Sequence, residues 1–89
     1  MIRVFLRHIV EDFAQWREAF DGMEPLRQAG GVQANGIFHA LDDPNDVTVW
    51  HDFETREKAE AFITSDVFGA ALADAGVTGE PIAWLTRAA

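Results

Sequence analysis

The chain has 89 residues, which is enough for one domain spanning 1–89 and no more. Its 15 acidic and 7 basic residues give a formal net charge of −8, so no basic surface exists for nucleic acid or an anionic membrane. The absence of cysteine excludes disulfides, thiolate metal sites and a cysteine nucleophile.

The first predicted element is a strand over residues 2–10, because its side chains alternate in character. One side of this strand carries Ile2, Val4, Leu6, His8 and Val10. The other side also carries apolar residues, among them Phe5 and Ile9. A period of two with both faces apolar indicates a central strand that is covered on both sides.

A helix follows, with Asp12 as its N-cap. Its apolar residues fall three or four apart and share one face: Phe13, Trp16, Phe20 and Met23. Gly22 and Pro25 must bend or break this helix. Pro25 is able to open a second short helix that ends at the Gly30-Gly31 pair.

Two strands and a turn are predicted next. The strands cover 32–41 and 47–53, and the intervening residues 42–46 have the composition of a turn. Together they form a hairpin. Asn35 beside Gly36 is an unfavoured residue for a strand, and we interpret the pair either as a bulge or as a place where Asn35 orients a ligand carbonyl.

Two further helices and a strand complete the chain. The first helix begins at Thr55, and the second is capped by Ser65 or Asp66 and ends at Gly76. The last strand covers 81–87, with Pro81 expected at its start, since proline cannot donate within a ladder.

This order of elements predicts an α+β fold of the ferredoxin-like, split βαβ type. It consists of a four-stranded antiparallel sheet with helices on one face. The other face is open, yet its side chains are apolar, and a monomer would expose them. We therefore expect a homodimer in which sheet packs on sheet.

The sequence resembles the dimeric α+β barrels that include the antibiotic-biosynthesis-monooxygenase-like proteins, among them cyclase-like and uncharacterised members. The likeness covers nearly the whole chain. It is carried by the segments Arg7-His8-x-Val10-x-Asp12-Phe13-x-x-Trp16-x-x-x-Phe20, 29–32, 42–47, Phe62-x-x-Ser65 and 75–81. The resemblance implies a homodimer with facing sheets and a pocket between sheet and helices in each subunit.

The same resemblance implies a range of activities. Monooxygenases of this family oxidise electron-rich aromatic substrates with O₂ and need no metal or organic cofactor, whereas other members are isomerases or degrade haem. The chain has no tyrosine, which excludes any tyrosine-dependent step. Haem-degrading relatives use a helix-borne histidine, but all three histidines here fall in predicted strands, so we expect no cofactor.

His8 is the candidate catalytic residue. It lies on an otherwise apolar strand face, where a buried imidazole can act as acid or base near neutral pH. The alternative is a structural histidine that bonds a backbone or carboxylate group.

The candidate pocket residues are large aromatic or polar side chains: Trp16, Asn35, Trp50, His51 and Trp84. An aromatic-lined pocket suits a small apolar or aromatic ligand, although the same residues serve packing equally well. His39 and His51 lie on the two hairpin strands and are able to face each other. Two histidines would need a third ligand from elsewhere to hold a metal, so we expect no metal site. We interpret them instead as two strand residues that are partly exposed to solvent.

Two hypotheses for function follow. The first is a small-molecule enzyme that performs a cofactor-independent oxidation or a cyclisation of an aromatic or polyketide-like substrate, with His8 as acid or base. The second is a non-catalytic homodimer that binds a small molecule or has an accessory role. No apolar run approaches the ~20 residues of a membrane span, and the N-terminal residues do not resemble a signal peptide. We therefore expect a soluble cytoplasmic protein.

Overall fold

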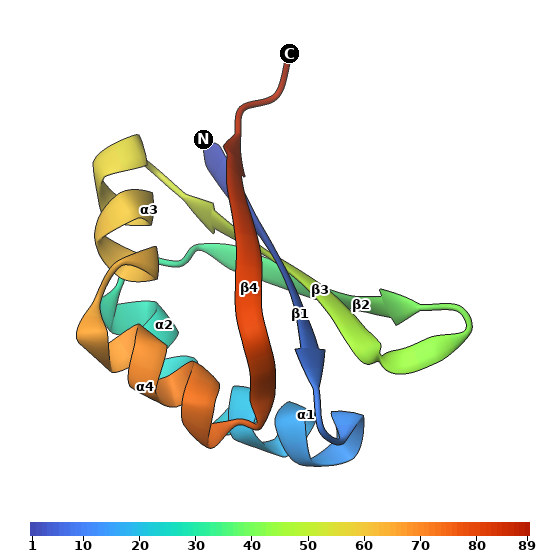
Figure 1. Ribbon diagram of the computed structural model, residues 1–89. Helices are drawn as coiled ribbons and strands as arrows, with labels where there is room; N and C mark the ends of the chain where they lie inside the picture. Colours follow the sequence, from blue (N-terminus) through green and yellow to red (C-terminus); the bar gives the residue numbers. More distant parts are fainter.

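The helices and strands follow one another along the chain in the predicted order (Figure 1). The computed structural model describes all residues, 1–89. The elements are β1 (Ile2–Val10), α1 (Phe13–Gly22), α2 (Glu24–Ala29), β2 (Ala34–Ala40), β3 (Asp43–Phe53), α3 (Arg56–Ile63), α4 (Asp66–Asp74) and β4 (Val77–Thr86).

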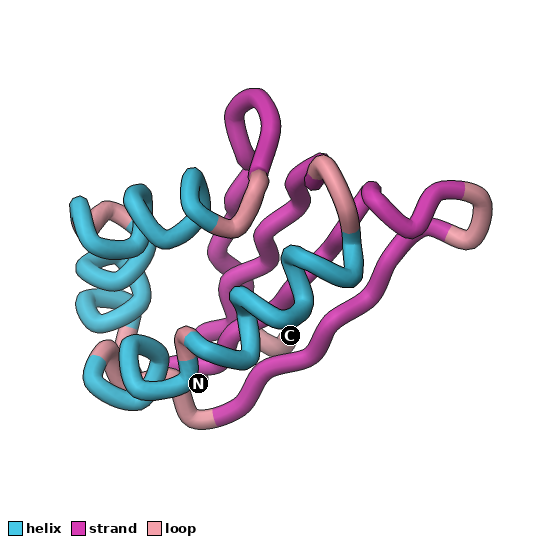
Figure 2. The backbone as a smooth tube through the Cα atoms, turned by 90° about the horizontal axis from the view of Figure 1, so that it is seen from below, coloured by secondary structure: helices cyan, strands magenta, loops and turns pink.

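The four strands form one antiparallel sheet in the order β2-β3-β1-β4, which confirms the predicted ferredoxin-like arrangement. All four helices lie on one side of this sheet, as two perpendicular views show (Figures 1 and 2). β1 is a central strand, as its two apolar faces predicted. None of the helices combines the length and apolar character needed to cross a bilayer.

The predicted helix ends are confirmed. Asp12, Thr55 and Ser65 each accept a hydrogen bond from the backbone N–H three residues later, at 3.2, 3.3 and 3.1 Å. These bonds satisfy donors that the first helical turn would otherwise leave unpaired. Gly76 ends α4 with φ of 82°, in the left-handed region that favours glycine.

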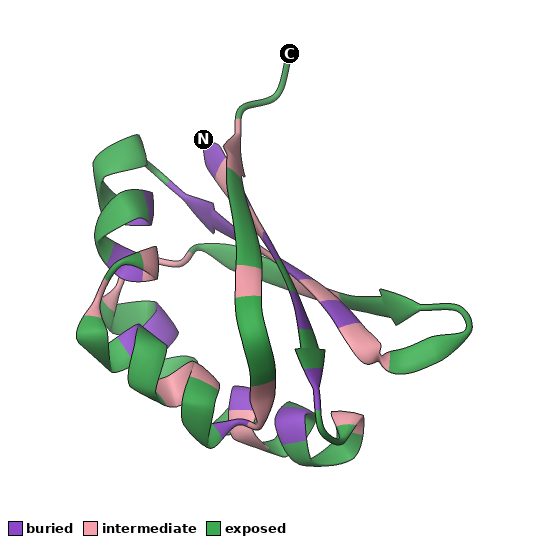
Figure 3. Ribbon diagram, viewed as in Figure 1, coloured by how far each residue is buried: buried purple, intermediate pink, exposed green.

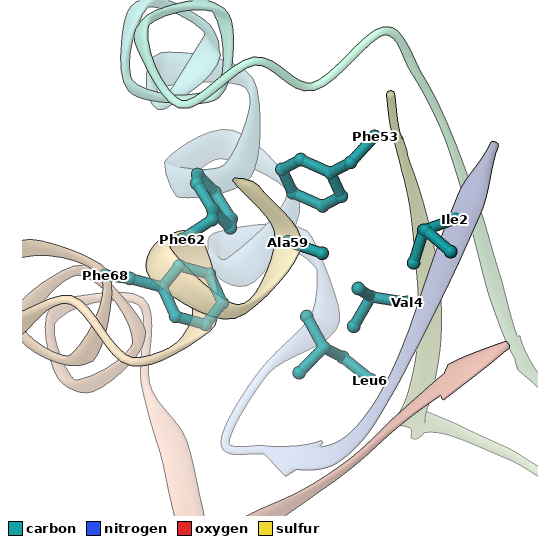
Figure 4. Packing of buried hydrophobic residues seen from close by; sticks show 7 residues of the cluster. All are labelled: Ile2, Val4, Leu6, Phe53, Ala59, Phe62 and Phe68. Carbon is teal, nitrogen blue, oxygen red and sulfur yellow. The ribbon is translucent and has the colours of Figure 1, made fainter. Parts of the chain in front are cut away.

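The core fills the space between the sheet and the helices (Figure 3). In one cluster, Ile2, Val4 and Leu6 of β1 point toward Phe62 of α3 and Phe68 of α4 (Figure 4). A second cluster joins α1 to the sheet and contains Val10, Trp16, Phe20, Val47, Val49 and Ala75. Both clusters use the strand faces and helical stripes that the sequence predicted.

The hairpin turn is shorter than predicted. β2 begins at Ala34, the turn is Leu41-Asp42, and residues 43–46 belong to β3. The reason is that both ends of this segment have ladder partners: Asp43 pairs with Ala40 of β2, and Asp46 pairs with Ile9 of β1. Asn45 lies between them, and its Oδ1 accepts a hydrogen bond of 2.9 Å from the Phe13 backbone N–H. Asn45 thereby ties the hairpin to the start of α1.

Two details of the strands differ from expectation. Asn35 and Gly36 pair regularly with His51 and Trp50, so the predicted bulge is wrong; the irregularity follows His39 instead. Pro81 lies inside β4 and not at its start. β4 is an edge strand, and its register to β1 shifts between Arg7 and Ile9, so the missing proline N–H falls where the ladder is already interrupted.

Gly36 is required by the position of a tryptophan. A Cβ at this residue would overlap the indole of Trp50, and the Arg3 guanidinium also lies over this ring, at 3.8 Å from its centroid. We expect Gly36→Ala to lower the free energy of unfolding by about 1–3 kcal/mol, because the indole must move. The measurement is urea denaturation. The control is Gly69→Ala in α4, where a Cβ meets no atom, and an equal loss in both variants would contradict the explanation.

Candidate functional site

A small cavity lies between the sheet and the helices. Its volume is about 20 Å³, which is room for about one water molecule. Nine of its lining residues are apolar, and the three polar ones are His8, Arg27 and His51. The apolar lining consists of Leu6, Trp16, Phe20, Met23, Leu26, Val49, Phe62, Phe68 and Leu72.

His8 reaches this cavity from the middle of the sheet. Its side chain is on the helix-facing side of β1 and is only 4% exposed, and its ring lies 5.5 Å from that of Trp16. Neither ring nitrogen has a hydrogen-bond partner. Burial lowers the pKa of His8 below 6.5, so the imidazole is neutral at pH 7 and keeps a lone pair that can accept a proton.

His51 is more deeply buried than predicted. It is 3% exposed, not partly exposed, because it follows Val47 and Val49 on the inward side of β3. Its Nδ1 has no hydrogen-bond partner. Burial, reinforced by the positive charge of Arg27 and by His8, lowers the pKa of His51 to about 4.

Arg27 is a buried cation without a carboxylate partner. It is 7% exposed, its guanidinium stacks 3.9 Å from the Phe20 ring centroid, and Nη1 donates to the Phe20 carbonyl. Its Nε has no partner. Burial lowers the pKa of Arg27, against the opposing effect of Glu24 and Asp21. A buried charge with so few partners costs free energy unless something else pairs with it.

The remaining predicted pocket residues divide between the two faces of the sheet. Trp16 lines the cavity and is 1% exposed. Asn35 lies opposite His51 on β2 but is exposed and does not line the cavity. Trp50 and Trp84 lie on the open face of the sheet, away from the helices, where Trp84 stacks on Phe5.

The two hairpin histidines are not brought together. His39 is opposite Val47, and His51 is opposite Asn35, so the two imidazoles stand four residues apart along the hairpin. His39 is exposed, and its Nδ1 lies 3.1 Å from the Ala40 carbonyl oxygen. No group of three or more potential ligands that could hold a metal occurs in the structure.

The cavity has one side that is partly open to solvent. Only three of its lining residues are partly exposed. They are Met23, the N-cap of α2, Leu26 within α2, and Leu72 of α4. The other nine are buried. A ligand that enters from solvent must therefore pass these three flexible, apolar side chains.

Arg27 was not among the residues predicted from the sequence, although a signal was present. The apolar stripe Phe13, Trp16, Phe20, Met23 continues with the same three- and four-residue spacing to position 27. A charged residue on such a stripe is directed at the core. The expected helix break at Gly22 and Pro25 concealed this continuity.

Solved structures share this fold over nearly the full chain. The crystal structure of an antibiotic biosynthesis monooxygenase matches with a TM-score of 0.77 and 15% identity, covering 100% of this chain and 99% of that chain. SnoaB, a cofactor-independent oxygenase from Streptomyces nogalater, matches with a TM-score of 0.74 and 13% identity, covering 99% of this chain and 94% of that chain. Rv0793 from Mycobacterium tuberculosis matches with a TM-score of 0.72 and 14% identity, and it also covers 99% of this chain and 94% of that chain. The chain has the fold of the antibiotic biosynthesis monooxygenases.

No family model matches the sequence, and no curated protein matches it. Identities of 13–15% establish the shared fold and not a shared reaction. The chemistry of the site depends on the cavity and its three buried polar side chains.

Proposed function

We propose that this chain is a small-molecule enzyme of the antibiotic-biosynthesis-monooxygenase type, with its active site in the cavity between sheet and helices. One observation carries the proposal. His8, His51 and Arg27 are all buried against an otherwise apolar cavity, and each has at least one polar atom without a partner. Such groups are costly to bury, and they concentrate at sites where a ligand completes their hydrogen bonds.

His8 is the proton acceptor in this proposal. Its lowered pKa leaves it unprotonated at neutral pH, and removal of a proton from an electron-rich aromatic substrate makes that substrate reactive toward O₂. Conversion of a hydroxyarene to the corresponding quinone consumes one O₂: a ring C–H and the phenol O–H are broken and become two C=O groups, while one oxygen atom enters the product and the other leaves as water. The substrate supplies the four electrons and both hydrogens, so no reductant or cofactor is needed.

Substrate entry requires side chains to move, since the cavity of about 20 Å³ cannot hold an aromatic ring. Met23, Leu26 and Leu72 form its partly exposed side, and methionine in particular adapts readily to new packing. The similarity in fold to SnoaB, whose described activity is cofactor-independent oxygenation, supports the same class of reaction.

The test of catalysis is the variant His8→Gln. It keeps a polar side chain but cannot accept a proton, so oxygen uptake with a panel of electron-rich hydroxyarenes should fall by about 100-fold or more. In the wild-type protein, kcat/KM should be constant above pH 6.5 and decline only at lower pH, where His8 becomes protonated. Unchanged oxygen uptake by a folded His8→Gln variant would contradict the role of His8.

A second function is favoured by a different observation. The cavity is nearly filled by the side chains of the chain itself, which suits a non-catalytic homodimer that binds a small molecule or has an accessory role. A ligand that saturates the protein, but that neither wild type nor His8→Gln converts, would favour this non-catalytic function.

The proposal includes a homodimer formed through the open face of the sheet. Apolar side chains on this face are exposed in the single chain, among them Ile9, Phe38, Ile82 and Trp84. Exposed apolar side chains that gather on one face of a sheet are typical of a protein interface.

A further inference from the structure

We infer that Arg27 binds the anionic group of the ligand, so that the cavity selects small apolar molecules carrying one acidic group, such as an aryl carboxylate or a phenolate. This inference rests on the function proposed above and names its substrate class. It starts from the location of the Arg27 side chain, which lines the cavity and is buried.

The carboxylates whose charges act on Arg27 are hydrogen-bonded to other residues. The charges of Glu24 and Asp21 influence it, but neither forms an ion pair with it. Asp21 accepts a hydrogen bond from Arg17 at 3.2 Å, and Glu24 accepts one from Gln28 at 3.4 Å. The guanidinium therefore retains an unpaired Nε–H donor and a positive charge that no protein group neutralises.

The structural use of Arg27 does not explain its presence. Its one hydrogen bond goes to the Phe20 carbonyl, which also accepts a bond of 3.1 Å from the Met23 backbone N–H. Removing the guanidinium would thus leave no acceptor without a partner. An apolar side chain of similar length would pack on Phe20 without the cost of burying a charge.

The other two polar residues suit an anion with an aromatic body. His8 and His51 are neutral at pH 7, so they add no repelling or competing charge, and a neutral imidazole can donate one N–H. The aromatic side chains of Trp16, Phe20 and Phe62 line the same cavity. A guanidinium beside an aromatic wall recognises a carboxylate through directed, charge-assisted hydrogen bonds.

The experiment compares benzoate with benzamide, which has nearly the same shape but no charge. Binding is followed through the NMR signal of the Arg27 Nε–H and by titration calorimetry at pH 7. We expect benzoate to shift this signal in a saturable manner and benzamide to bind at least about tenfold more weakly. Equal binding of the two, or no saturable shift at millimolar concentrations, would overturn the inference.

The matched variants are Arg27→Met and Arg27→Lys. Arg27→Met should abolish the preference for benzoate while leaving the melting temperature unchanged or higher, and Arg27→Lys should retain part of the preference through its charge. A lower melting temperature with the preference intact would show that Arg27 is structural. The benzoate experiment measures binding and no turnover, so its result does not depend on the His8→Gln experiment. If His8→Gln loses oxygen uptake but still binds benzoate, that result concerns the catalytic role of His8 and leaves the role of Arg27 unaffected.

Discussion

Lowering the pH from 7 to 4 is expected to reduce the free energy of unfolding by about 3 kcal/mol through His51 alone. In the unfolded chain this imidazole has an ordinary pKa of 6.5 and takes up a proton as the pH falls through that value. In the folded chain its pKa is about 4, mainly because of burial. The unfolded state therefore binds more protons between pH 6.5 and 4. Stability is full above pH 6.5 and is lost through that window.

The carboxylates act in a lower range of pH. Hydrogen bonds from Arg7 and Arg3 lower the pKa of Asp46 and Asp52 below 3.8, so their stabilising effect is lost only below that pH. Burial lowers the pKa of His8 as well, so protonation of His8 at low pH also reduces the free energy of unfolding, as it does for His51. A decline between pH 6.5 and 4 therefore reports on the two buried histidines.

Urea denaturation at a series of pH values measures this effect. His51→Gln cannot be protonated, so its stability should change with pH by about 3 kcal/mol less than that of the wild type over the same window. Parallel curves for the two proteins would show that His51 is not buried in the neutral form. For a domain of this size the loss is a large part of the total stability.

Most of the fold could be predicted from local patterns. Alternation in β1, the three- and four-residue stripe of α1 and the caps at Asp12, Thr55 and Ser65 each depend on neighbours in sequence, and each is confirmed. The errors occur where a distant partner decides the outcome. Asp43 and Asp46 have the composition of a turn, yet pairing with Ala40 and Ile9 makes them part of a strand.

The candidate site was predictable only in part, for the same reason. The positions of His8 and His51 on apolar strand faces were visible in the sequence, and both side chains line the cavity. Their lack of hydrogen-bond partners was not visible, because it depends on which side chains of α1, α2 and α3 reach them. Trp50 and Trp84 show the limit of alternation, which groups residues by face but does not say which face the helices cover.

The open face of the sheet leads to the second large expected effect. It combines exposed apolar side chains with two ion pairs, Arg3–Asp52 and Arg7–Asp46, each linked by two hydrogen bonds. Because these arginines are neutralised within the chain, they bring little net charge to the face. A second copy of the chain that is related by a two-fold axis presents the same apolar surface, and the two can cover each other.

The wild-type protein is therefore expected to have about twice the chain mass of 9.9 kDa in light scattering at micromolar concentration. Ile82→Glu places a charge on the open face at a residue that is 59% exposed in the single chain, so the monomer should fold as before. In a two-fold dimer the substitution occurs twice, and each unpaired carboxylate loses water on association. The dissociation constant should rise by about 100-fold or more. The control is Val67→Glu on α4, 61% exposed on the side of the helices, which should remain dimeric. A wild-type monomer, or equal dissociation of both variants, would mean that the open face of the sheet is not where two chains meet.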